Sequence, residues 1–96
     1  MIERDDIMGK RIMVVDDSRM VELQMQNLLE DTDYRIVAYC RNGEDSIKTY
    51  GQVLPDLVTM DIIMPGMDGL ETAQAILEKY PDARIIMVSS LAYEDT

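Results

Sequence analysis

The chain has 96 residues, enough for one domain built around one hydrophobic core. Its 19 acidic residues outnumber its 9 basic residues, and the formal charge of -10 argues against direct binding to nucleic acid or to anionic membranes, which need basic patches. A single cysteine excludes an internal disulfide, and no apolar run approaches the roughly 20 residues that span a bilayer. We therefore expect a soluble protein of the reducing cytoplasm.

The first half of the chain alternates between strand and helix patterns. Residues 1–9 are polar and unpatterned, which indicates a loose lead-in, and the apolar run 11–15 predicts a strand. Beyond Ser18 the pattern changes to helical spacing, which predicts a helix packed against a sheet. The apolar stripe of this helix consists of Val21, Met25, Leu28 and Leu29.

A second strand and a second helix follow. Alternating side chains over residues 34–39 predict a strand at the edge of the sheet. Residues 41–43 form a turn, and residues 44–50 predict a short helix that ends at Gly51.

The second half of the chain repeats the alternation. An apolar run over residues 57–66 carries one carboxylate, Asp61, and stops at a Pro-Gly turn, which predicts a strand buried on both faces. Asp68 with Glu71 three residues later forms a capping-box pattern at the start of a helix. Residues 84–88 predict a fourth strand. The apolar stripe of the intervening helix consists of Leu70, Ala73, Leu77 and Tyr80, and residues 91–96 indicate a connection into a further helix.

Three predicted strands end in polar side chains: Asp16-Asp17, Asp61 and Ser89-Ser90. If the strands are parallel, these side chains share the sheet edge where open α/β sheets bind ligands. Acids before a helix can simply cap it, so the first pair alone indicates little. Three carboxylates at one edge repel each other unless a cation or protons intervene, and Mg²⁺ favours oxygen ligands. The pattern therefore predicts a magnesium site.

These motifs resemble a known family. Asp16-Asp17, Asp61 with residues 64–69 (Met-Pro-Gly-Met-Asp-Gly) behind it, and residues 88–90 (Val-Ser-Ser) are similar to the receiver domain of two-component response regulators, most of all the CheY-type chemotaxis regulators. The resemblance implies an α/β fold with a flavodoxin-like (CheY-like) doubly wound parallel sheet, of strand order 2-1-3-4-5 in the complete family. It covers residues 10–96, so we expect four strands and about three helices, without the family's last strand and its two flanking helices.

The resemblance also implies a role for each site residue. Asp61 would accept a phosphoryl group from a phosphohistidine on a sensor histidine kinase, and the signal would pass to a downstream protein target or effector domain. Asp17 and Asp61 would bind Mg²⁺ directly, together with the backbone carbonyl of Ile63, and Asp16 would act largely through water. The Ser89 hydroxyl would bond a phosphate oxygen and act as a switch, although a strand-end hydroxyl can also cap the next helix.

Other readings of the sequence remain open. The family's Lys at the end of the fifth strand has no counterpart here, and an open fourth strand would invite pairing with another chain. The alternative is therefore a truncated, self-associating receiver fragment that acts only as a structural or interaction module. Two copies could form a homodimer by exchanging elements. A phosphatase with an aspartyl nucleophile is disfavoured, because such enzymes usually carry Asp-x-Asp and a cap domain, whereas this chain has adjacent acids. A flavodoxin is disfavoured as well, because Asp16-Asp17 would repel the flavin phosphate. Bulky Ile63 and Leu91, where the family tunes phosphate loss, predict a long-lived phosphoryl group.

Overall fold

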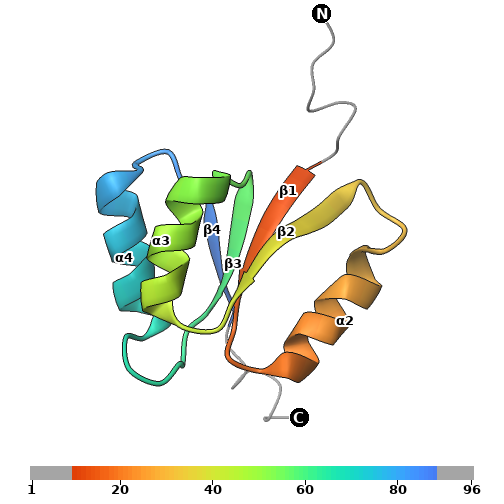
Figure 1. Cartoon of the computed structure of the whole chain (residues 1–96), viewed down its shortest axis with the longest axis horizontal. Helices are drawn as coiled ribbons and strands as arrows, with labels where there is room; N and C mark the ends of the chain where they lie inside the picture. The colour runs from red at the N-terminus through yellow and green to blue at the C-terminus, as the bar shows by residue number, and fades with distance from the viewer. Residues whose placement is uncertain (1–9, 89–96) are drawn as a thin grey trace, which may run out of the picture.

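The computed structural model describes residues 10–88, which form one four-stranded parallel sheet with helices on both faces (Figure 1). Strand β1 (Lys10–Val15) lies between β2 (Tyr34–Cys40) and β3 (Leu57–Asp61), and β4 (Ile85–Val88) pairs with β3. All three pairings are parallel. The order β2-β1-β3-β4 confirms the predicted doubly wound, flavodoxin-like arrangement of four strands. Predictions for residues 1–9 and 89–96 fall outside the described residues.

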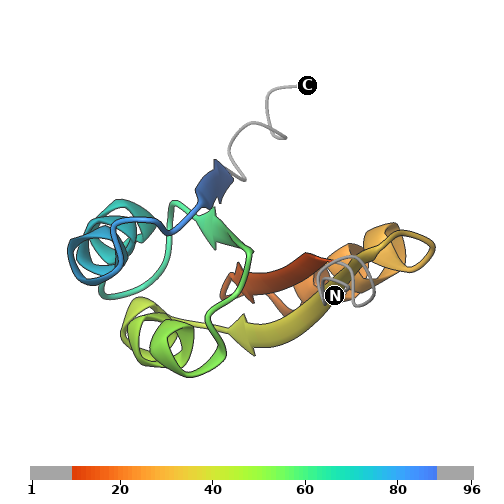
Figure 2. The same ribbon diagram turned by 90° about the horizontal axis from the view of Figure 1, so that it is seen from above.

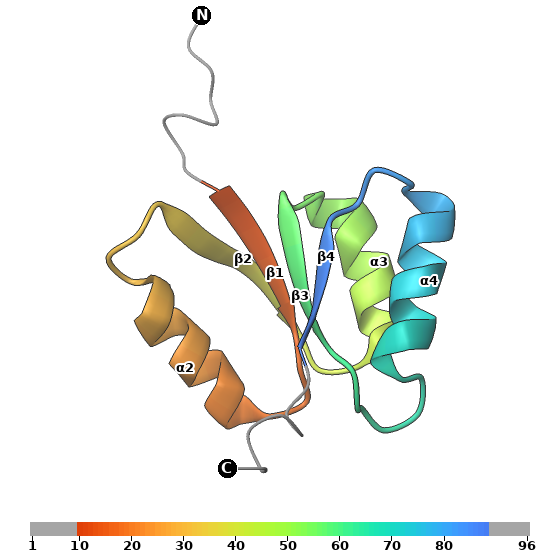
Figure 3. The same cartoon turned by 180° about the vertical axis from the view of Figure 1, so that it is seen from behind.

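The three helices divide between the two faces of the sheet. Helix α2 (Arg19–Leu29) lies on one face, and α3 (Gly43–Val53) and α4 (Gly69–Lys79) lie side by side on the other (Figures 2 and 3). The carboxyl ends of the strands all lie at the lower edge of the sheet in Figure 1. No helix in the described part of the chain is long and apolar enough to cross a membrane.

Helix α3 is longer than predicted, because Gly51 does not end it. The helix continues to Val53 and is capped by Leu54, whose φ of 45° is left-handed. A Cβ atom at position 51 would meet the hydroxyl of Tyr80, so glycine here serves packing against Tyr80 rather than a turn. The ring of Tyr80 lies 4.8 Å from that of Tyr50, which joins the two helices.

Helix α4 begins with the predicted capping box. The Asp68 carboxylate accepts from the Glu71 amide at 2.9 Å, and the Glu71 carboxylate accepts from the Asp68 amide at 3.2 Å. The apolar stripe predicted for this helix is partly correct: Ala73 is buried and Tyr80 packs against the core, but Leu70 and Leu77 are exposed. The buried face consists of Gly69, Thr72, Ala73 and Ile76.

The hydrophobic core lies between the sheet and the α3/α4 pair. Methionines supply much of it, and their flexible side chains fill a core that has no Trp or Phe. Cys40 is buried there as a free thiol. The cluster consists of Met13, Val15, Cys40, Tyr50, Val58, Met60, Met64 and Ile76.

Helix α2 is less well covered than its stripe predicts. None of its residues is buried, and Leu28 is 71% exposed. The helix packs chiefly against β2, and among residues 10–88 no helix covers β3 and β4 on the same side of the sheet. An apolar stripe therefore predicted the helix correctly but overestimated its burial.

Candidate functional site

The candidate site lies at the point where the strand order of the sheet reverses. The chain passes from β1 outward to β2 on one side, and the next strand, β3, pairs with β1 on the other side. Crossovers on opposite faces leave a crevice at the carboxyl ends of these two strands. Asp16 and Asp17 follow β1 directly, and Asp61 is the last residue of β3.

The structure brings the three acids together. Each offers a carboxylate oxygen, and these oxygens all lie within 4.8 Å of one another. Asp16 and Asp61 are buried, with exposed fractions of 7% and 6%, whereas Asp17 is exposed at the mouth of the site. Three negative charges so close together, two of them withdrawn from water, call for a cation or for protons.

Backbone amides hold the two buried carboxylates in place. Asp16 accepts a hydrogen bond from the amide of Ser18 at 2.8 Å, and Asp61 accepts one from the amide of Ile63 at 3.3 Å. The backbone of Ile62, the residue after Asp61, is held on both sides. Its amide donates to β4, and its carbonyl accepts from the amide of Gly69 at 2.8 Å. The acids therefore project from a rigid framework.

Burial is the main electrostatic influence on both inner acids. It raises the pKa of Asp61, and the negative charge of Asp17 raises it further, while the Ile63 and Ile62 amides act in the opposite direction. Burial likewise raises the pKa of Asp16, against the Ser18 amide and with the charges of Asp61 and Asp17. A bound divalent cation would reverse this balance, since it favours the ionised carboxylates.

A small apolar cavity of about 180 Å³ adjoins the two buried acids on the α2 side of the sheet. The two acids are its only charged residues. The apolar part of the lining consists of Val14, Val15, Val21, Met25 and Val88, with Thr59.

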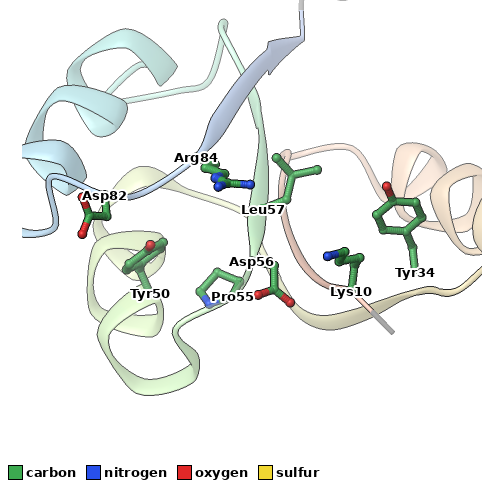
Figure 4. A pocket seen from close by; sticks show the side chains of 8 residues that line it. All are labelled: Lys10, Tyr34, Tyr50, Pro55, Asp56, Leu57, Asp82 and Arg84. Atoms are coloured by element: carbon green, nitrogen blue, oxygen red, sulfur yellow. The ribbon is translucent and has the colours of Figure 1, made fainter. Parts of the chain in front are cut away.

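A larger cavity of about 530 Å³ lies at the opposite end of the strands (Figure 4). Lys10, Asp56, Asp82 and Arg84 line it with mixed charges, and the Asp56 carboxylate already accepts from the Arg11 amide at 2.8 Å. Because these groups do not converge on one ligand chemistry, the carboxyl-end crevice is the better candidate despite its smaller volume.

Gly69 supports the site in a way that sequence reasoning missed. It belongs to the Met-Pro-Gly-Met-Asp-Gly motif and opens α4. A Cβ atom here would overlap the carbonyl oxygen of Asp61, so only glycine lets α4 approach the end of β3 this closely. A glycine directly after an N-cap is the one sequence signal for such contact. Gly66, with a φ of 77°, serves the turn as expected.

The remaining predicted site residues are placed less fully. Ile63 donates its amide to Asp61 and exposes 51% of its side chain, while the metal-binding role of its carbonyl stays a prediction. Ser89 and Leu91 lie outside residues 10–88, so the switch role of Ser89 also stays a prediction.

Fold and site together define a doubly wound α/β domain with a carboxylate cluster at its switch point. The family profile described as "Response regulator receiver domain" matches residues 12–96. The chain belongs to this family, whose members are phosphoacceptor signalling modules of two-component systems and not catalytic enzymes.

Similar proteins include several chemotaxis regulators. Chemotaxis protein CheY of Listeria monocytogenes is 39% identical over 84 residues, which are 88% of this chain and 71% of that protein. CheY of Bacillus subtilis is 37% identical over 87 residues, 91% of this chain and 72% of that protein.

Solved structures give the same fold. The CheY of the Borrelia burgdorferi CheX-CheY-BeF3-Mg complex superposes with a TM-score of 0.86 at 31% identity, covering 98% of this chain and 72% of that chain. The response regulator domain of Thermotoga maritima CheB has a TM-score of 0.80 at 35% identity, covering 88% of this chain and 63% of that one. The response regulator TrrA of Thermotoga maritima, in complex with Mg²⁺ and BeF, has a TM-score of 0.79 at 38% identity, covering 90% and 75%.

Proposed function

We propose that Asp61 is the phosphoacceptor of a receiver unit spanning residues 10–96, with residues 1–9 as a lead-in. In this proposal Asp16, Asp17, Asp61 and the carbonyl of Ile63 hold Mg²⁺, and the Ser89 hydroxyl contacts the phosphoryl group. One observation carries the proposal: three carboxylate oxygens from two strands lie within 4.8 Å of one another at the switch point.

The donor set fits Mg²⁺. Hard carboxylate and carbonyl oxygens are the ligands that this ion prefers, and it usually keeps waters that a phosphoryl oxygen can replace. No His lies in the sequence, and the buried Cys40 belongs to the core rather than to the acids, so carboxylates dominate the donor set among residues 10–88. When bound, Mg²⁺ neutralises charge on the carboxylates and on the incoming phosphoryl oxygens.

The proposed transfer balances simply. A carboxylate oxygen of Asp61 attacks phosphorus, the phosphorus–nitrogen bond of the donor phosphohistidine breaks, and the departing imidazole takes up a proton. The Ile63 amide holds the nucleophile at 3.3 Å. The exposed Ile63 side chain stands beside this group and would hinder attacking water, which supports a long-lived phosphoryl group.

The proposal implies two kinds of partner. A sensor histidine kinase supplies the phosphoryl group, and a downstream protein target or effector domain responds to it. Neither nucleic acid nor membrane is proposed as a direct partner, in keeping with the charge of -10. We expect the exchange to occur in the reducing cytoplasm, which suits the unpaired Cys40.

The test is phosphorylation by acetyl phosphate, read as a mass gain of one phosphoryl group. We expect the gain to require Mg²⁺ and to disappear in Asp61→Asn. The matched control is Asp82→Asn, which removes an exposed acid at the opposite end of the sheet and should leave the gain intact. An equal mass gain in Asp61→Asn, or none in the unaltered chain, would contradict the proposal.

The open edge of the sheet favours a second candidate function, self-association as an interaction module. Among residues 10–88, β4 is an edge strand, and its Ile86 is 52% exposed beside the uncovered α2 side. Such an edge can pair with another chain. A solution mass twice that of the chain, without a mass gain from acetyl phosphate, would favour this candidate over the first.

A further inference from the structure

Tyr39 connects the end of β2 to the acid-bearing turn. Its hydroxyl donates to the backbone carbonyl of Ser18 at 2.6 Å, a contact between residues 21 apart in the sequence. A distance of 2.6 Å is short for a hydroxyl donor, which indicates a well-formed bond. Tyr39 is half-buried, so water competes less for this bond than at the surface.

The backbone of Ser18 is held by two hydrogen bonds. Its carbonyl accepts from Tyr39, while its amide donates to the Asp16 carboxylate at 2.8 Å. The amide of Asp16 in turn donates to the carbonyl of Cys40, the residue after Tyr39, at 3.0 Å. Asp17 therefore lies in a turn with both flanking residues tied to β2.

Asp17 depends on this arrangement more than the other two acids do. Asp16 and Asp61 are buried and accept amide hydrogen bonds, whereas Asp17 is exposed. An exposed side chain gains a defined direction mainly from its backbone, and the backbone here is fixed through Ser18. Groups that orient metal ligands without touching the metal commonly govern its affinity.

The Tyr39 ring is itself held in position. The guanidinium of Arg41 lies over the ring, 6.0 Å from its centroid. Burial, followed by the charge of Asp16, raises the pKa of Tyr39, so the hydroxyl keeps its proton and remains a donor. The contact with Ser18 is thus available throughout the neutral pH range.

We infer that Tyr39 is a positioning residue for the divalent-cation site, whose hydroxyl fixes the Asp16–Ser18 turn so that Asp17 joins Asp16 and Asp61. This inference rests on the proposed function, because it assigns Tyr39 to the same site. It adds a residue from β2, a strand that contributes no acid. A hydroxyl that served the fold alone would change stability and leave metal affinity unaltered.

The experiment compares Tyr39→Phe with Tyr34→Phe by calorimetric titration with Mg²⁺ alone. Both variants lose one phenolic hydroxyl from β2, but Tyr34 begins the strand, at the end away from the acids. We expect Tyr39→Phe to bind Mg²⁺ about tenfold more weakly and Tyr34→Phe to bind it like the unaltered chain. Thermal melts in EDTA establish that each variant is folded at the titration temperature.

The outcomes separate the inference from the proposed function. If the unaltered chain binds Mg²⁺, Asp61→Asn does not, and Tyr39→Phe matches the unaltered chain, the inference is overturned and the proposed function stands. If the unaltered chain does not bind Mg²⁺, the proposed metal site fails and the inference fails with it. Should Tyr39→Phe not fold, Tyr39→Met, which also lacks the hydroxyl, takes its place, and Mg²⁺ affinity equal to that of the unaltered chain in a folded Tyr39→Met would overturn the inference.

Discussion

The two faces of the sheet carry similar helices but very different amounts of burial. Helix α4 sets Ile76 into the core with no exposed surface, whereas α2 on the other face has no buried residue and leaves Leu28 71% exposed. Both helices are amphipathic in sequence. An apolar stripe therefore shows that a helix can pack, while the extent of packing depends on what lies opposite it.

The acid cluster uses both faces. On the α4 side, Gly69 lies directly against the carbonyl of Asp61, which makes the end of β3 rigid. On the α2 side, a cavity of about 180 Å³ adjoins Asp16 and Asp61, so space remains beside these two buried acids. A site of this kind needs a firm support and an open approach, and the unequal faces supply one each.

The largest expected contrast is between the truncation of one apolar side chain in α4 and of one in α2, on opposite faces of the sheet. Ile76→Ala should lower the free energy of unfolding by about 3 to 4 kcal/mol, because it leaves a cavity in a closely packed core. Leu28→Ala should lower it by less than about 0.5 kcal/mol, since the side chain is already mostly in water. Urea unfolding measures both. Equal losses would mean that Leu28 is covered in solution, which would undo the contrast between the faces.

A second contrast concerns two glycines near the site. Gly69→Ala should cost about 2 to 3 kcal/mol, because the new methyl group overlaps the Asp61 carbonyl and must push α4 away from β3. Gly66→Ala should cost only about 1 kcal/mol, for the strain of a φ of 77°, because a Cβ there meets nothing within 4 Å. Urea unfolding again provides the measurement.

The same two variants also test the support of the site. Displacing the Asp61 peptide should weaken Mg²⁺ binding in Gly69→Ala, whereas Gly66→Ala should retain it. Full Mg²⁺ affinity in a folded Gly69→Ala would show that the close approach of α4 matters for the fold alone.

Much of the fold could be predicted from the sequence because its signals are local. Strand and helix periods identified the seven elements within residues 10–88, and the capping box located the start of α4. Acids at the ends of two predicted strands identified the cluster, since parallel strands bring their carboxyl ends to one edge. The roles of these acids toward Mg²⁺ and phosphate stay predictions.

Features set by close contact between elements could not be predicted. Thr72 is polar, yet it is buried in α4 because its hydroxyl donates to the Asp68 carbonyl at 2.8 Å within the helix. Gly51 looked like a helix end but serves contact with Tyr80. The bond from Tyr39 to Ser18 joins residues that only strand register brings together. Each of these three features depends on which surfaces of the elements come into contact, and the local sequence pattern does not specify those contacts.

The pH dependence of the free energy of unfolding should show how much the buried acids of the crevice destabilise the fold. Burial raises the pKa of Asp61 and of Asp16 above the ordinary value of 3.8. Between the ordinary and the raised pKa, the folded state binds more protons than the unfolded state, so stability falls as pH rises through this range and stays reduced at neutral pH. Asp61→Asn removes one of these charges. In EDTA at pH 7 it should raise the free energy of unfolding, because it removes a buried negative charge.

The control and the metal complete this prediction. The gain of Asp61→Asn should vanish below pH 3.8, where both states of the unaltered chain are protonated, and Asp82→Asn should show no such gain at pH 7. Adding Mg²⁺ should stabilise the unaltered chain and not Asp61→Asn, because only the former keeps the acid. A metal-free Asp61→Asn less stable than the unaltered chain at pH 7 would show that the carboxylates are already compensated within the fold.

The smallest expected effect on stability belongs to the open edge. Ile86 is 52% exposed on β4, and Leu70 is 58% exposed on α4, so a lysine at either position should change the free energy of unfolding by less than about 0.5 kcal/mol. Their effects on association should differ, because β4, unlike α4, is an edge strand among residues 10–88 and has unpaired backbone groups to offer another chain. If the chain shows a concentration-dependent mass by light scattering, Ile86→Lys should return it to the mass of one chain and Leu70→Lys should not. Equal effects of the two lysines would assign association to general surface hydrophobicity, and the two faces would then differ in burial alone.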